Sequence, residues 1–137
     1  MPTPADRLAA ARASADPAEL RALTDVGLPF VDQALAENPQ TPPDALLLLA
    51  GVRRGDWNDN RLLCLLAQHP GADGTVLGAV LAAVAERLTA GQRPYAATLA
   101  LAGRPEVPVE QVRALGRLAG ASARLRRGMA RVLAGRS

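Results

Sequence analysis

The chain has 137 residues, and its 49% hydrophobic content is enough to bury a core without disulfides or metal ions. It contains 29 alanines and 22 leucines but no isoleucine and no lysine, and its aromatic content is 2%. Ala and Leu enter helices at low cost, whereas the residues that favour strands are scarce. This composition predicts an all-α protein and excludes an all-β one. Frequent Leu and a net charge of only +3 also argue against disorder.

Cys64 is the single cysteine and His69 the single histidine. They exclude an internal disulfide framework and a metal site built from several Cys or His ligands, so we expect no metal and no cofactor. Residues 8–11 are too short an apolar stretch for a secretory signal, and the uncharged run 76–85 is about half the length of a membrane span. Arg in place of Lys, with so much Ala, is typical of GC-rich bacterial genomes. We therefore expect a cytoplasmic bacterial protein with no membrane association.

Helices are predicted along the whole chain, as one domain over residues 1–137. Residues 5–27 are expected to form irregular N-terminal helices, one of them capped by Asp16 with Glu19. Thr41 is predicted to cap a helix over 42–52, and Asp56 with Asp59 to open the helix that carries the apolar residues 62–67. Residues 74–90 have the pattern expected of a fully buried helix. Further helices are expected over 94–103, from 108 to Gly120, and after Ser122.

The chain also repeats itself. Residues 35–39, 66–70 and 101–105 each read Leu-Ala-x-x-Pro, with prolines 31 and 35 residues apart, and residues 133–136 form a partial fourth copy. Such a period is typical of a helical hairpin. It divides the chain into repeats of approximately 29–56, 57–91 and 92–121 with a partial repeat at 122–137. Because Asn38, His69 and Arg104 share the position before the proline, we interpret His69 as structural, binding the last carbonyls of its own helix.

Residues 34–50, Ala-Leu-Ala-Glu-Asn-Pro-Gln-Thr-Pro-Pro-Asp-Ala-Leu-Leu-Leu-Leu-Ala, resemble the leucine-rich repeat variant, an α-solenoid family similar to HEAT repeats. Residues 65–81 and 100–118 resemble it less closely. The resemblance implies a short right-handed α-solenoid of stacked antiparallel helix pairs, with about seven to nine helices, that acts as a binding scaffold. The spacing is longer than is usual in that family. The cysteine cluster that holds an iron–sulfur group in one branch of it is missing here.

For function, the leading hypothesis is a non-enzymatic module that holds a protein partner on a concave face, with no catalytic residue. The candidate contacts on that face are Trp57, Asp59, Arg61 and Tyr95. A small DNA-modifying enzyme built around Trp57 and Asp59 is a second alternative. Cys64 is interpreted as a small core residue rather than a nucleophile. The chain could be a monomer or a homodimer.

Charge suggests a different alternative. Residues 1–110 carry a net charge of −4, whereas residues 111–137 carry +7. On the last helix Arg124, Arg127 and Arg131 fall on one side, with Arg126 set apart from them. Together with Arg113 and Arg117 they could bind the phosphate backbone of DNA or RNA. A solvated helix face explains the same pattern.

Overall fold

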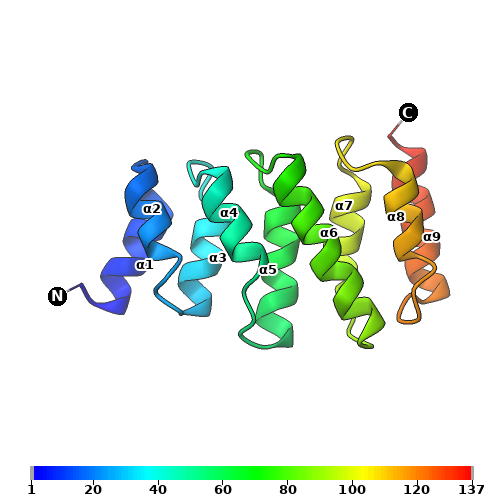
Figure 1. The fold of residues 1–137 in the computed structure, drawn as a ribbon, viewed down its shortest axis with the longest axis horizontal. Coiled ribbons are helices and arrows are strands. Elements are labelled where there is room, and N and C mark those ends of the chain that lie inside the picture. Colours follow the sequence, from blue (N-terminus) through cyan, green and yellow to red (C-terminus); the bar gives the residue numbers. More distant parts are fainter. Residues whose placement is uncertain (1, 137) are drawn as a thin grey trace.

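The chain is all-α. A computed structural model describes residues 2–136, and within them it has nine α-helices and no strand (Figure 1). The helices are α1 (Pro4–Ala13), α2 (Pro17–Leu23), α3 (Pro29–Glu37), α4 (Pro43–Ala50), α5 (Asp56–Gln68), α6 (Gly74–Thr89), α7 (Tyr95–Ala102), α8 (Val109–Leu115) and α9 (Ala123–Ala134). The all-α fold class predicted from composition is confirmed, and the number of helices lies within the predicted range.

Caps and prolines explain where the helices begin. Side chains of Thr3, Asp16, Asp73 and Ser122 accept hydrogen bonds from the first-turn N–H groups of α1, α2, α6 and α9. Proline stands in the first turn of α1, α2, α3 and α4, where a missing N–H group has no cost. The caps predicted at Asp16 and Ser122 are confirmed, but the expected return bond from Glu19 is not made, because the backbone N–H of Asp16 donates to the hydroxyl of Ser14.

The helices lie in two rows along the molecule (Figure 1). In one row α1 contacts α3, α3 contacts α5, α5 contacts α7 and α7 contacts α9; in the other row α2 contacts α4 and α4 contacts α6. Most helices therefore pack mainly on the helix two places along the chain. Helices α1 and α9 lie at opposite ends.

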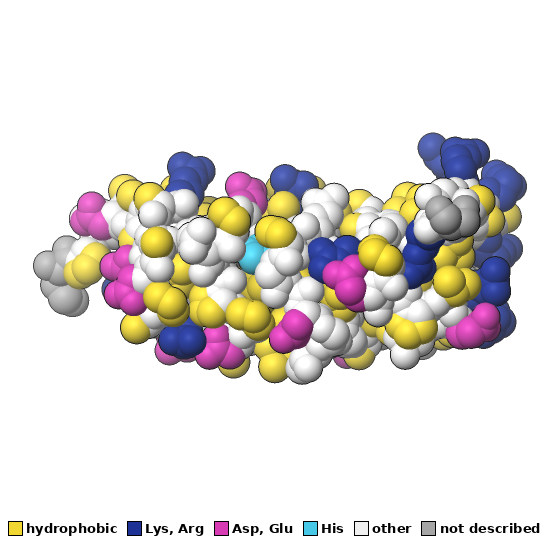
Figure 2. All heavy atoms as spheres, turned by 90° about the horizontal axis from the view of Figure 1, so that it is seen from above, with side chains coloured by type: hydrophobic (Ala, Val, Ile, Leu, Met, Phe, Trp, Pro, Cys, Tyr) yellow, Lys and Arg dark blue, Asp and Glu magenta, His cyan; other side chains and the backbone are white. Residues whose placement is uncertain are grey.

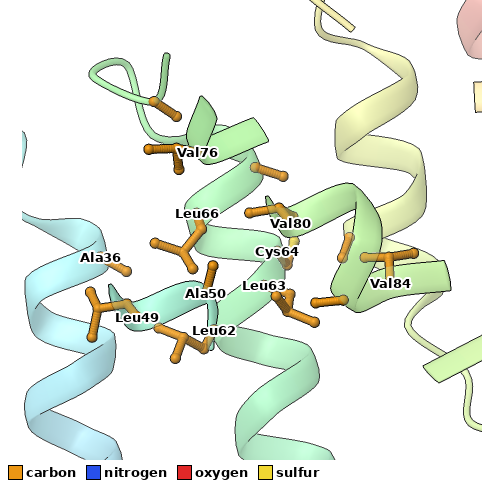
Figure 3. Packing of buried hydrophobic residues seen from close by; sticks show 14 of the residues in the cluster. Ala36, Leu49, Ala50, Leu62, Leu63, Cys64, Leu66, Val76, Val80 and Val84 are labelled. Atoms are coloured by element: carbon orange, nitrogen blue, oxygen red, sulfur yellow. The ribbon is translucent and has the colours of Figure 1, made fainter. Parts of the chain in front are cut away.

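One apolar core runs between the rows. In its central part, Leu62, Leu63 and Leu66 of α5 face Val80 of α6 and Leu49 of α4 (Figure 3). The leucines that begin the Leu-Ala-x-x-Pro stretches are all 0% exposed: Leu35, Leu66 and Leu101. Burying each such side chain contributes about 1.5–3 kcal/mol.

Three local expectations were wrong. Thr41 does not cap α4, which has Pro42 at its N-cap; the buried Thr41 hydroxyl instead donates to the carbonyl of Leu35 at 2.7 Å. Helix α8 ends at Leu115, before Gly120, because the chain turns tightly through residues 116–120. Helix α6 is not buried all round: Gly78, Ala82 and Glu86 form an exposed side.

Four side chains join successive corners of the chain, and we name Asn38, His69, Arg104 and Arg136 the corner side chains. The amide of Asn38 donates to the carbonyls of Ala11 and Ser14 at 2.9 Å each. The His69 Nε2 atom lies 2.8 Å from the carbonyl oxygen of Asn38. The expectation that His69 binds its own helix was wrong, because its ring crosses to the preceding corner.

The same pattern continues towards α9. Arg104 donates to the carbonyls of His69 at 2.8 Å and Ala72 at 3.0 Å. Arg136 donates to the carbonyl of Val107 at 2.7 Å. Carbonyls near helix ends have no partner inside their own helix, so these bonds satisfy them across the interface between stacked helices.

The hydrogen bonds of His69 also fix its tautomer. Its Nδ1 atom accepts from the N–H of Gly71 at 2.9 Å, while its Nε2 atom faces the carbonyl oxygen of Asn38, which can only accept. The ring is therefore neutral with the proton on Nε2. This places His69 in a structural role.

Replacing Arg104 tests the corner bonds. Arg104→Met keeps the aliphatic stem but removes the donors to His69 and Ala72, so we expect the free energy of unfolding to fall by about 2–3 kcal/mol in urea titrations. Arg113→Met is the control, because the Arg113 side chain is 58% exposed and pairs only with Glu110; it should change stability by less than about 0.5 kcal/mol. Equal effects of the two changes would contradict a special role for the corner.

Replacing Gly120 tests the packing of the turn after α8, and Gly78 of α6 is the control. A Cβ atom on Gly120 would overlap the backbone carbonyl of Leu88, whereas one on Gly78 meets open space. We expect Gly120→Ala to destabilise the protein by about 1–3 kcal/mol or more. Gly78→Ala should stabilise it by about 0.5–1 kcal/mol, because Ala is the better helix former. Thermal melts followed by circular dichroism measure both changes, and a neutral Gly120→Ala would contradict the close approach.

Candidate functional site

A hollow of about 260 Å³ lies between the first turns of α5 and α7. Its border includes Trp57, Asn60 and Arg61 from α5, with Arg93 and Tyr95 from the start of α7. Trp57 is 74% exposed, the highest value among the large hydrophobic side chains of the described residues. The structure thus brings together Trp57, Arg61 and Tyr95, three of the four predicted contacts. Arg93 was not predicted, because nothing in its local sequence marks it.

The aromatic side chains of the chain share a position in the fold. Phe30, Trp57 and Tyr95 each lie in the first turn of a helix of the same row: α3, α5 and α7. Phe30 is 43% exposed, and Tyr95 donates from its hydroxyl to the carbonyl of Gly120 at 3.2 Å. Since these helices stack in order, the rings lie along one edge of the row, with Tyr95 also packed against the core.

Asp59 does not belong to this hollow. Its side chain is 4% exposed and forms an ion pair with Arg87 of α6 at 3.1 Å. Its other oxygen accepts from the backbone N–H of Arg54 at 2.8 Å. The N-cap of α5 is Gly55, whose φ of 132° favours glycine. The predicted surface position of Asp59 is therefore wrong, because its carboxylate is used inside the fold.

The Asp59–Arg87 pair supports both walls of the hollow. Arg87 also donates to the side chain of Gln92 at 3.2 Å, and the N–H of Gln92 donates back to the carbonyl of Arg87 at 2.9 Å. Gln92 directly precedes Arg93. The pair thus holds the beginning of α5, which carries Trp57, against the segment that leads into α7.

A second ion pair lies beside the first. Arg54 donates from Nε to Asp32 of α3 at 2.8 Å, and the Asp32 side chain is 1% exposed. Burial raises the pKa of Asp32, and the hydrogen bond and charge of Arg54 partly oppose this rise. The two pairs tie α3, α5 and α6 together near the first turns of α3 and α5.

Under the hollow, Cys64 is buried and is a structural residue. Burial raises the pKa of its thiol, and the charge of Arg61 only partly opposes the rise. A thiol with a raised pKa is a poor nucleophile at neutral pH.

Across residues 2–136, no group of three or more His, Cys, Asp and Glu side chains is placed to hold a metal ion. Over the same residues, no helix has the length and apolar character to span a membrane.

The predicted arginine set falls on two surfaces. Arg124, Arg127 and Arg131 are exposed on α9 and form the outer ridge, with no ion pair among the described residues. Arg113 of α8 and Arg117 of the turn after it instead border a separate cleft together with Arg126 of α9. Figure 2 shows arginine side chains gathered at this end of the molecule.

The chain was compared with protein-family models, with curated proteins and with solved structures, and nothing matched.

Replacing Arg87 tests the support of the hollow. Arg87→Met leaves the Asp59 carboxylate buried without its cation, so we expect a loss of about 3–5 kcal/mol in the free energy of unfolding. Adding Asp59→Asn removes the stranded charge and should restore part of that loss. Arg53→Met is the control, because the Arg53–Glu86 pair is exposed and 3.5 Å long; it should cost less than about 1 kcal/mol. A double variant less stable than Arg87→Met alone would contradict this account.

Proposed function

We propose that this chain is a non-enzymatic helical-repeat module that holds a protein partner in the hollow between α5 and α7. In this proposal its helices form a short right-handed α-solenoid of antiparallel pairs, similar to the leucine-rich repeat variant. Three observations support this organisation: the Leu-Ala-x-x-Pro stretches, their equally buried leucines, and the corner side chains that join one stretch to the next.

The exposure of Trp57 is the observation that carries the proposal. A tryptophan offers more apolar area to a core than any other residue, yet this one is 74% exposed. Its neighbours in the hollow are Arg61, Arg93 and Tyr95. Trp, Tyr and Arg are the residue types that dominate binding energy at protein interfaces. A partner with an apolar anchor and an acceptor for the guanidinium groups fits this combination.

Nucleic-acid binding through the outer ridge stays a second candidate. The observation that favours it is the absence of Asp and Glu from residues 111–136, which leaves Arg124, Arg127 and Arg131 exposed without counter-charges. Phosphates would supply these charges. A DNA-modifying enzyme around Trp57 and Asp59 is not carried further, because the Asp59 carboxylate is buried in its pair with Arg87.

Peptide selection tests the proposed function. Displayed random peptides are selected on the folded protein, and their affinities are then measured for the native chain and for Trp57→Ala. We expect Trp57→Ala to weaken the selected peptides by about 2 kcal/mol, roughly thirtyfold. Because Trp57 is the single tryptophan and is exposed, its fluorescence should also shift to shorter wavelength on binding.

Leu48→Ala is the matched control, because Leu48 is a 61% exposed apolar residue on α4 in the other row. It should leave the affinities unchanged. Peptides that bind Trp57→Ala as well as the native chain would contradict the proposal. Duplex DNA binding that weakens between about 50 and 200 mM salt, and is lost on replacing all three ridge arginines by Ala, would favour the nucleic-acid candidate instead.

A further inference from the structure

A larger cleft, of about 500 Å³, lies between α8 and α9, at the end of the molecule opposite α1. Its lining combines an apolar floor with a cationic rim, and the residues that matter are Val109, Met129, Leu133, Arg113, Arg117 and Arg126. The hollow that holds Trp57 is lined by different residues. The two sites are therefore separate.

The cleft has the character of a surface on which a helix packs. Along its row each helix from α1 to α7 is covered by the next odd-numbered one, and within residues 2–136 no helix covers α9 in this way. Leu133 of α9 corresponds in the sequence repeat to Leu101, which is 0% exposed, yet Leu133 is only partly buried. Likewise Ala130 is exposed, whereas the corresponding Thr98 is 0% exposed. Positions that receive a neighbouring helix elsewhere are thus open here.

The arginines at the rim of the cleft favour an occupant that carries negative charge. Arg113 has an ion pair with Glu110 at 3.2 Å, and both side chains are more than half exposed. The guanidinium of Arg126 is held at the rim by the carbonyl of Ala121 at 3.0 Å. Residues 111–136 contain no acid, so the positive charge of the rim is largely uncompensated within the chain.

From this combination we propose that the α8–α9 cleft docks an acidic amphipathic helix from another protein. Its apolar side would cover Met129 and Leu133, and its carboxylates would pair with the rim arginines. A nucleic-acid backbone would match the charges but leave the apolar floor uncovered. A second copy of this chain matches less well, because its first helix, α1, carries Arg7 and Arg12 against a single acid, Asp6.

Fluorescence anisotropy tests the docking. The probe is a labelled helical peptide of about 15 residues with Leu along one side and Glu along the other. A peptide with the same composition in scrambled order has no apolar side and should bind at least about tenfold more weakly, because the cleft requires both features.

Two variants of α9 locate the binding. Ala130→Glu places an acid inside the cleft and should weaken the probe by at least about tenfold, whereas Ala123→Glu makes the same charge change on the exposed first residue of α9, outside the cleft, and should change affinity by less than about twofold. Both residues are exposed, so both variants are expected to fold, and thermal melts verify this.

Four results would overturn the proposal: no binding of the probe, equal binding of the scrambled peptide, equal weakening by the two variants, or displacement of the probe by duplex DNA that depends on the outer ridge. The last would assign this end of the molecule to nucleic acid. Trp57→Ala should bind the probe like the native chain, so failure of the hollow as a partner site would leave this result intact.

Discussion

The hydrogen bonds between successive corners are the constraint on which this molecule depends. Carbonyls at the ends of stacked helices are removed from water but have no partner within their own helix, and leaving each unsatisfied would cost about 1–3 kcal/mol. The corner side chains satisfy them from the next corner along the chain, through an amide, an imidazole and two guanidinium groups. Three kinds of side-chain group thus make the same kind of bond, each to a backbone carbonyl of the preceding corner. The bonds therefore fix how successive helices of a row are placed, and apolar packing fills the space between them.

Near the first turns of α3 and α5, buried ion pairs take the same role. Asp32 with Arg54, and Asp59 with Arg87, join α3, α5 and α6 where no corner side chain reaches. Buried pairs contribute little net stability, because desolvation offsets much of their attraction, but removing one partner is costly. Their main effect here is to fix the positions of the helices that they join. They hold the first turn of α5 against the segment before α7, so Trp57 and Tyr95 are presented on a rigid frame, as a binding site requires.

Much of the fold could be read from the sequence, because prolines, caps and apolar spacing act locally. The bounds of α2, α6 and α9 follow from Asp16, Asp73 and Ser122 with the apolar residues after them. The partners of several polar side chains could not be predicted. Thr41 and Asp59 have the sequence pattern of helix caps, and His69 has that of a group that binds its own helix. Asp59 and His69 instead bind residues 28 and 31 positions away, across contacts that form only when the helices pack together. Thr41 donates to the carbonyl of Leu35, six residues earlier. Three residues of the hollow were predicted, because the rare aromatic residues Trp57 and Tyr95 stand out in the sequence, but the cleft at α8–α9 was not, since it arises from two helices packing together.

The charge of α9 has an energetic consequence for what the molecule binds. The ion pairs of the described residues involve Arg21, Arg53, Arg54, Arg87, Arg104 and Arg113, and none involves an arginine of α9. On that helix Arg124, Arg127 and Arg131 are three and four residues apart, a spacing at which like charges destabilise a helix by about 0.2–0.5 kcal/mol per pair. Met129 and Leu125 hold the helix by burial in spite of this repulsion. A negatively charged partner would weaken the repulsion between these arginines. Relief of this repulsion, which destabilises α9 in the free chain, would then contribute to the binding free energy. An anionic partner is therefore favoured at this end whichever of its two surfaces makes the contact.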